Sequence, residues 1–133
     1  GIHFTPQQHI LDLGSPENIS LAARDIILER LKQDELPTAL FCMNDMVALG
    51  AMQAVQSLGL SVPDDISIIG FDGLPLGGYA TPALTSVQTN RASLGSIGVT
   101  LLVERMTQTA PAVQRVTTGG DLLVRRSTTT CRD

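Results

Sequence analysis

The sequence is poor in the residues that mark metal sites, disulfide frameworks and membrane spans. Its two cysteines, Cys42 and Cys131, show no spacing typical of a metal site or a disulfide framework. Its two histidines, His3 and His9, do not share a helical face. No apolar run approaches the roughly 20 residues that cross a bilayer, and no signal peptide opens the chain. We therefore expect no metal, no cofactor and no membrane contact, in a protein of the reducing cytoplasm.

Basic residues and catalytic signatures are scarce as well. Nine Lys and Arg residues against thirteen Asp and Glu residues give a net charge of -4. Phosphate binding depends mainly on clustered basic residues, so the chain is not expected to bind DNA by itself. The glycines of residues 70–78 lack the spacing of a phosphate-binding loop, and no nucleophile elbow is present. Cys42 lies in an apolar run and is interpreted as an inert core thiol. We expect no enzyme and no catalytic residue.

The hydrophobic pattern predicts helices and strands that alternate along the chain. Ser15-Pro16-Glu17 is a start signal for a helix that ends near residues 36–37. Residues 38–43 (TALFCM) form a short apolar run, typical of a strand buried on both faces of a parallel sheet. A second helix runs from Asn44-Asp45 to Leu58, with Gly59 as its C-cap. Residues 66–71 (ISIIGF) predict the next strand. This order predicts an α/β fold in which helices flank a parallel sheet.

The second half of the chain continues with a turn-rich segment, a strand, a helix and a last strand. A short strand is predicted at residues 84–88 after the Gly- and Pro-rich residues 73–82. The last strand is predicted at residues 121–126, and the Thr-rich tail after it is expected to fray. Between these strands, a third helix carries one apolar stripe, made up of Leu94, Ile97, Leu101, Leu102 and Met106.

Two polar residues directly follow predicted strands and are candidates for a binding site. Asn44 follows residues 38–43, and Asp72 follows residues 66–71. Ligands of open parallel sheets bind beyond the carboxyl ends of the strands, where these two side chains would meet. An amide and a carboxylate suit hydroxyls, ring nitrogens or amines. The alternative is local: Asn44 and Asp45 would cap the second helix, and Asp72 would stabilise a turn.

The second helix is apolar around most of its circumference. Either it is buried between two layers of this chain, or one stripe packs on the sheet and another packs on a second subunit. The pattern alone leaves both interpretations open.

Four segments, in this order, resemble motifs of the LacI/GalR family of bacterial transcriptional regulators. The resemblance covers about residues 37–128 and includes residues 37–51 (PTALFCMNDMVALGA), 59–72 (GLSVPDDISIIGFD), 81–87 (TPALTSV) and 122–128 (LLVRRST). It implies the C-terminal lobe of a periplasmic-binding-protein-like (type I) bilobal fold, with chain segments of the N-terminal lobe.

The resemblance also implies how the chain is divided. Residues 1–128 would form part of the effector-binding domain, with residues 1–88 mainly in the C-terminal lobe and about 89–120 from the N-terminal lobe. Residues 129–133 would be a disordered tail. The helix-turn-helix domain of the family is absent from this chain, so operator DNA would be bound only through an N-terminal domain outside it.

Roles for individual residues follow from the same resemblance. It implies that Asn44 and Asp72 line the effector cleft, where family members bind sugars, nucleobases or similar small molecules. It also implies that the all-round apolar helix belongs to a homodimer interface. The implied interface residues are Met46, Leu49, Met52, Gln53, Leu74 and Tyr79.

Two departures from the family pattern limit what it implies about the effector. Gly73 stands where a second acidic residue is common, and Ser86 stands where threonine is common. The effector identity can therefore not be taken from a relative. An alternative function is a periplasmic sugar-binding protein of an ABC transporter, which shares the fold and the paired motifs. Residues 62–65 and 81–87 favour the regulator, which we expect to be a repressor.

Overall fold

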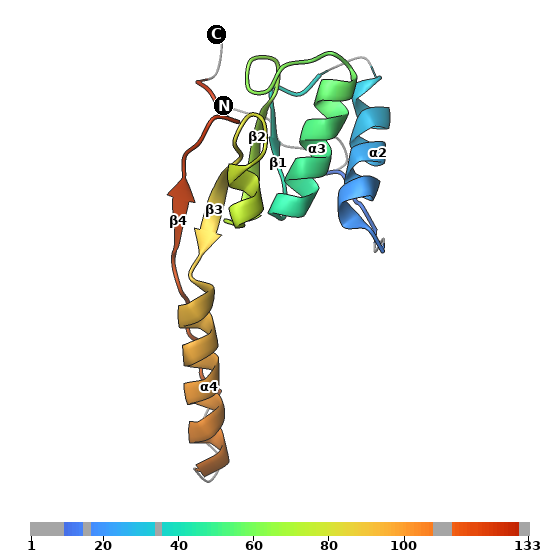
Figure 1. Ribbon diagram of the computed structural model, residues 1–133. Coiled ribbons are helices and arrows are strands. Elements are labelled where there is room, and N and C mark those ends of the chain that lie inside the picture. The colour runs from blue at the N-terminus through green and yellow to red at the C-terminus, as the bar shows by residue number, and fades with distance from the viewer. Residues whose placement is uncertain (1–9, 15–16, 34–35, 108–112, 131–133) are drawn as a thin grey trace, which may run out of the picture.

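A computed structural model describes residues 10–14, 17–33, 36–107 and 113–130 of the chain. The elements in chain order are α2 (Ile19–Leu31), β1 (Ala39–Phe41), α3 (Asp45–Ser57), β2 (Ser67–Asp72), the 3-10 helix η1 (Pro75–Gly78), β3 (Thr85–Thr89), α4 (Arg91–Thr107) and β4 (Gly120–Leu123). Helix α3 packs against the sheet and α2 packs against α3, whereas α4 extends away from the sheet (Figure 1).

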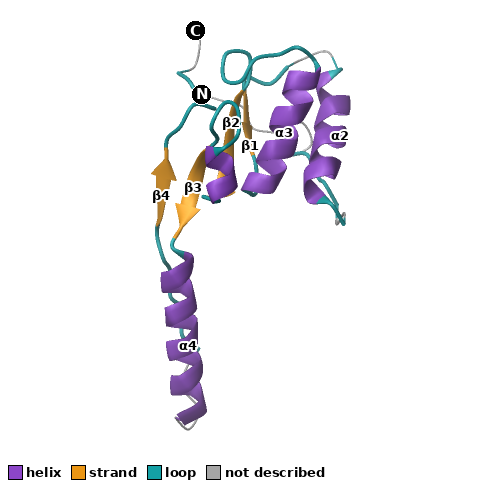
Figure 2. Cartoon of the chain, in the orientation of Figure 1, coloured by secondary structure: helices purple, strands orange, loops and turns teal. Residues whose placement is uncertain are grey.

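The four strands form one sheet in the order β1-β2-β3-β4 (Figure 2). Strand β2 runs parallel to both β1 and β3, with Leu40 opposite Ile68 and Ile69 opposite Thr85. The predicted α/β fold with a parallel sheet is confirmed for these three strands. Strand β4 pairs with β3 in the antiparallel direction, which the prediction did not include. It ends at Leu123, earlier than the predicted residue 126.

Strand β1 differs from its prediction. It has three residues instead of six, and the expectation that both of its faces are buried is wrong, because Phe41 is 69% exposed. The reason is its place in the sheet. As an edge strand it has one neighbour, β2, and in the described part of the chain helices cover only one face of the sheet (Figure 1).

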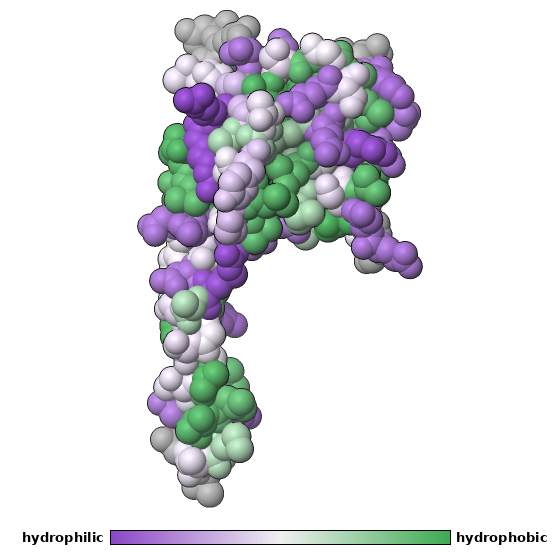
Figure 3. Space-filling model, in the orientation of Figure 1, coloured by the Kyte–Doolittle hydropathy of each residue, from purple (hydrophilic) through white to green (hydrophobic). Residues whose placement is uncertain are grey.

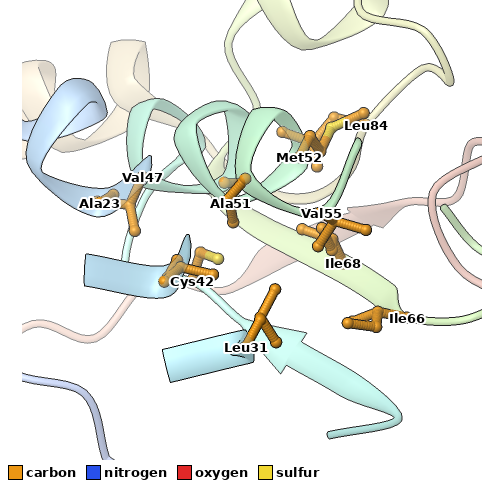
Figure 4. Close-up of a cluster of buried hydrophobic side chains, with 13 residues drawn as sticks. Ala23, Leu31, Cys42, Val47, Ala51, Met52, Val55, Ile66, Ile68 and Leu84 are labelled. Atoms are coloured by element: carbon orange, nitrogen blue, oxygen red, sulfur yellow. The ribbon is translucent and has the colours of Figure 1, made fainter. Parts of the chain in front are cut away.

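Helix α3 lies between α2 and the sheet and contributes more residues to the core than any other element. Its buried apolar residues pack with Ile66 and Ile68 near β2, with Leu84 before β3 and with one face of α2 (Figure 4). Gly50 marks the closest approach of the two helices, because a Cβ there would collide with the Ser20 carbonyl oxygen. Burial between two layers of this chain therefore accounts for most of the apolar residues of α3, whereas Met46 stays exposed and Leu49 half-buried.

The ends of the helices test the expected caps. The Asn44 side chain accepts a hydrogen bond from the Val47 amide, and Gly59 has a φ of +74°, so the expected start and end of α3 are confirmed. The predicted start of α2 is wrong in detail. Its cap is Asn18, which accepts from the Leu21 amide, and the helix ends at Leu31, five residues before the predicted residue 36. Ser15 and Pro16 lie outside the described residues.

The segment after β4 is ordered against the sheet, so the expected fraying directly after residue 126 is wrong. Ser127 is fully buried. Its hydroxyl accepts from the Thr85 amide at 2.8 Å and donates to the Ile68 carbonyl at 2.6 Å. The Thr129 amide donates to the Ser67 hydroxyl. The polar composition of this segment reflects hydrogen bonding to β2 and β3, and residues 131–133 lie outside the described part of the chain.

Helix α4 has no buried residue over its 17 residues. Within its apolar stripe, Leu94, Leu102 and Met106 are exposed, at 45%, 59% and 77%, whereas Ile97 and Leu101 are half-buried. Figure 3 shows apolar side chains gathered over the part of α4 that is distant from the sheet. None of the described helices combines the length and apolar character that a membrane crossing requires.

Candidate functional site

Asn44 and Asp72 both stand at the carboxyl edge of the sheet. Phe41 of β1 is paired with Ile69 of β2. Asn44 comes three residues after Phe41, and Asp72 comes three residues after Ile69. Asn44 then begins α3, and Asp72 is the last residue of β2. Both residues are half-buried. The structure therefore brings an amide and a carboxylate to one edge, where polar groups of a ligand could reach both.

The Asn44 side chain caps α3. Its Oδ1 accepts from the Val47 amide at 2.9 Å, which confirms the capping interpretation. Its amide nitrogen donates no hydrogen bond to any residue that the structure describes. The two interpretations are therefore compatible, because one end of the amide caps the helix while the other is left with two N–H donors.

Asp72 has an unusual backbone. Its φ is +104°, a region that residues with a side chain rarely adopt and that costs on the order of 1–3 kcal/mol. Its carbonyl oxygen accepts from Arg91 Nη1 at 3.0 Å, whereas its carboxylate accepts no hydrogen bond from the described residues. No side-chain hydrogen bond among them supports the turn-forming alternative. Strained backbone of this kind is concentrated at functional sites.

Asp45 is a residue whose role the sequence reasoning missed, because it looked like a second cap. Its side chain is fully buried and reaches across the sheet instead. Asp45 Oδ1 accepts from the Ser86 hydroxyl, and Oδ2 accepts from the Leu74 amide, both at 2.5 Å. The Ser86 hydroxyl also accepts from the Gly73 amide at 3.1 Å. This buried network of Asp45 and Ser86 thus holds the two backbone amides that directly follow Asp72.

Two glycines make room for this arrangement. A Cβ at Gly70 would collide with Asp45 Oδ1, so the carboxylate fits only against a residue without a side chain. Gly73 has a φ of +67°, and a Cβ there would come within 2.7 Å of the Gln88 Cβ. A side chain at position 73 would therefore meet both backbone strain and a collision with Gln88.

Cys42 lies in the core next to this network. Burial, and secondarily the charge of Asp45, raises the pKa of its thiol to about 12. The thiol is therefore protonated at neutral pH and is a poor nucleophile, in agreement with an inert core residue. Among the residues that the structure describes, no cluster of His, Cys, Asp and Glu could hold a metal ion. His3 and His9 lie outside them.

A hollow of about 150 Å³ lies away from the candidate site. It is lined by residues 38–39, 63–65, 67 and 129–130, near the amino ends of β1 and β2. It does not include Asn44 or Asp72.

The residues expected at a subunit interface differ in their exposure. Tyr79 is 85% exposed, Met46 and Gln53 are exposed, and Leu49 and Leu74 are half-buried. Met52 is 3% exposed, because it packs into the core of its own chain. Met52 therefore presents little surface to a second subunit, whereas Tyr79, beside η1, is open.

Comparison with known proteins identifies relatives of this chain. Residues 5–129 match the family model described as a periplasmic binding protein-like domain. The HTH-type transcriptional repressor PurR of Pasteurella multocida is 42% identical over 97 residues, which cover 73% of this chain and 29% of that protein. The protein of the same name from Haemophilus influenzae (strain PittEE) is 43% identical over 100 residues, which cover 73% of this chain and 30% of that protein. The chain thus spans less than a third of the length of these relatives.

Solved structures show the same similarity in three dimensions. A LacI family transcriptional regulator from Arthrobacter sp. FB24, in complex with lactose, superposes with a TM-score of 0.74 at 31% identity. That match covers 82% of this chain and 41% of that protein. The lac repressor dimer bound to operator and the anti-inducer ONPF has a TM-score of 0.73 at 29% identity, covering 82% of this chain and 38% of that one.

Proposed function

Because this chain belongs to the periplasmic binding protein-like domain family and is part of the effector-binding domain of a LacI/GalR-type regulator, we propose that it contributes half of an effector site to a ligand-responsive transcriptional repressor. Residues 1–88 supply this half from the C-terminal lobe, and residues 89–120 belong to the N-terminal lobe, which supplies the other half. The regulator works in the cytoplasm and binds operator DNA through an N-terminal domain outside this chain.

The observation that carries the proposal is the half-buried carboxylate of Asp72 at the carboxyl edge of the sheet. It accepts no hydrogen bond from the described residues, while its backbone is fixed on both sides. A carboxylate in this position accepts hydrogen bonds from ligand hydroxyl or N–H groups. The amide nitrogen of Asn44, on the neighbouring strand end, donates to a ligand oxygen or ring nitrogen.

A sugar is the effector class that we favour. A sugar presents many hydroxyl groups, which are donors to Asp72 and acceptors from Asn44 at once. Two similar structures are described as complexes with sugars, one with lactose at 31% identity and one with ribose at 28% identity. A nucleobase is the other class with suitable N–H donors and ring-nitrogen acceptors, so the test below includes both.

The regulator is favoured over a transport protein. The curated relatives are named transcriptional repressors, and they share 42–43% identity with this chain. We further propose a homodimer that uses the exposed surface beside α3 and η1. Its residues are Met46, Leu49, Gln53, Leu74 and Tyr79, while the buried Met52 supports this surface from within the core.

Titration calorimetry of the intact protein tests the effector site. The ligands are lactose, ribose, adenine and guanine. Asp72→Ala removes a charge-assisted hydrogen bond, and we expect roughly 10- to 150-fold weaker binding of the ligand that the wild-type protein binds. Asparagine tolerates a positive φ, so Asp72→Asn should bind the ligand more weakly than the wild-type protein and more tightly than Asp72→Ala. The matched control is Asp25→Asn on α2, where the carboxylate is exposed and distant from the sheet edge.

Each outcome of this titration has a clear meaning. Unchanged affinity in Asp72→Ala would reject the role of the carboxylate. Equal losses in Asp72→Ala and Asp25→Asn would show a non-specific effect of charge. Binding of a purine base and of neither sugar would change the effector class and leave the site in place.

A further inference from the structure

We infer that Asp45 and Ser86 are positioning residues for the effector site, because they fix the backbone turn that presents the Asp72 carboxylate. The inference rests on the proposed function and adds two buried residues that do not themselves face the ligand.

The turn after β2 is held at three consecutive backbone groups. Arg91 Nη1 donates to the Asp72 carbonyl at 3.0 Å. The next two amides, of Gly73 and Leu74, donate to Ser86 Oγ and Asp45 Oδ2. Asp72 and Gly73 both have a positive φ, at +104° and +67°. Glycine adopts a positive φ without strain, whereas the φ of Asp72 persists only when the surrounding structure holds it, and these hydrogen bonds hold the residues on either side of its carboxylate.

The network is buried and has few alternatives. Asp45 and Ser86 are both 0% exposed. The hydroxyl proton of Ser86 points to Asp45 Oδ1, which leaves the lone pairs of Ser86 for the Gly73 amide. Hydrogen bonds to a buried carboxylate are stronger than neutral ones, because no water competes for the charge. Moving the turn would break the bonds of the Leu74 amide to Asp45 Oδ2 and of the Gly73 amide to Ser86 Oγ, and it would leave Oδ2 buried without its partner. The turn and Asp72 therefore keep one conformation.

The network also joins elements that are far apart in the sequence. Asp45 begins α3, Ser86 lies in β3, and the two are 41 residues apart. The Asp45 carboxylate fits against β2 because Gly70 has no side chain. Asp72 is thereby fixed relative to α3 and hence to Asn44, the residue before Asp45. The two proposed ligand groups are held at a set spacing by residues that do not touch the ligand.

Ser127 provides a matched control. It is also a fully buried serine, and its hydroxyl also makes two hydrogen bonds, to the Thr85 amide and the Ile68 carbonyl. The bonds of Ser127 reach β3 and β2 and do not involve the turn at Asp72, whereas those of Ser86 reach α3 and that turn. Ser86→Ala and Ser127→Ala therefore remove similar interactions and should lower the thermal stability similarly. Only Ser86→Ala should affect the effector site.

The first experiment is amide hydrogen exchange on the ligand-free intact protein, measured by NMR. Ser86→Ala and Asp45→Asn should speed exchange at the Gly73 and Leu74 amides by roughly tenfold or more, since the protecting hydrogen bonds are lost. Ser127→Ala should leave these two amides unchanged and speed exchange at Thr85. Ser86→Thr keeps the hydroxyl and should restore slow exchange. Unchanged exchange at Gly73 and Leu74 in Ser86→Ala would overturn the proposal.

The second experiment repeats the titrations with lactose, ribose, adenine and guanine. Ser86→Ala should weaken binding roughly tenfold, while Ser86→Thr and Ser127→Ala stay within about twofold of wild type. An equal loss in Ser127→Ala would show a general effect of stability and overturn the positioning role. If Asp72→Ala leaves binding unchanged, the proposed function fails, and the exchange experiment still decides whether Asp45 and Ser86 fix the turn.

Discussion

Replacing Gly50 with alanine tests the close packing of α3 against α2. A Cβ at this position would collide with the Ser20 carbonyl oxygen and lie 3.1 Å from the Arg24 amide nitrogen. Both are backbone atoms of α2, so no change of side-chain rotamer removes the collision. Helix α2 would have to move away from α3 as a unit, and the apolar contacts between them would loosen.

The expected magnitude combines two opposing effects. Overpacking a core costs about 1–3 kcal/mol, whereas glycine to alanine in a helix interior gains roughly 1 kcal/mol. We therefore expect Gly50→Ala to lower the free energy of unfolding by up to about 2 kcal/mol. Gly95 in α4 is the matched control, because a Cβ there meets no atom within 4 Å. Gly95→Ala should keep the helix gain without the collision.

Urea unfolding of the chain, followed by far-ultraviolet circular dichroism, measures both variants. The midpoint should fall for Gly50→Ala and stay level or rise for Gly95→Ala. If Gly50→Ala were as stable as Gly95→Ala, the two helices would not pack at this distance, and the reasoning would be refuted.

Three further predictions concern the thiol, α4 and DNA. In a Cys131→Ser background, folded Cys42 should react with iodoacetamide at pH 8 far more slowly than after unfolding. The pKa of folded Cys42, about 12, lies above the ordinary 9.0, so its contribution to stability is present below pH 9 and declines as the pH rises toward 12. The urea midpoint should therefore be lower at pH 10.5 than at pH 8. The chain should self-associate in sedimentation equilibrium through the exposed residues of the α4 stripe, and Leu102→Gln with Met106→Gln should shift it toward monomer; a strictly monomeric wild-type chain would contradict this. The acidic chain should give no sequence-dependent shift of operator DNA at physiological salt, and a sub-micromolar shift would disprove that.

Local patterns were sufficient to predict the elements that depend on neighbouring residues. The apolar run of β2, the Asn44 cap and Gly59 at the end of α3 were all predicted, because strand burial and helix caps depend on residues a few positions apart. The order of strand, helix and strand was sufficient to predict a parallel sheet. The exposed face of β1 was not predictable in this way, since its burial depends on which layers cover the sheet.

In the candidate site as well, the sequence predicted residues that depend on local patterns and missed residues that depend on distant contacts. Asn44 and Asp72 were identified because each directly follows a strand, and the register places them at one edge. Asp45 was missed because an acidic residue in the first turn of a helix is commonly explained by the helix itself. Its partners, Leu74 and Ser86, are 29 and 41 residues away, and no local pattern indicates such contacts. Ser127 was hidden in the same way within a polar segment that looked like a frayed tail.

A crystal structure of the intact protein with its bound effector tests the central claim most directly. We expect polar atoms of the effector within about 2.7–3.2 Å of an Asp72 carboxylate oxygen and of the Asn44 amide nitrogen. In this complex, Asp45 should still accept a hydrogen bond from the Leu74 amide, and Ser86 should still accept one from the Gly73 amide. An effector seated elsewhere, with the Asp72 carboxylate contacting only solvent, would contradict the account.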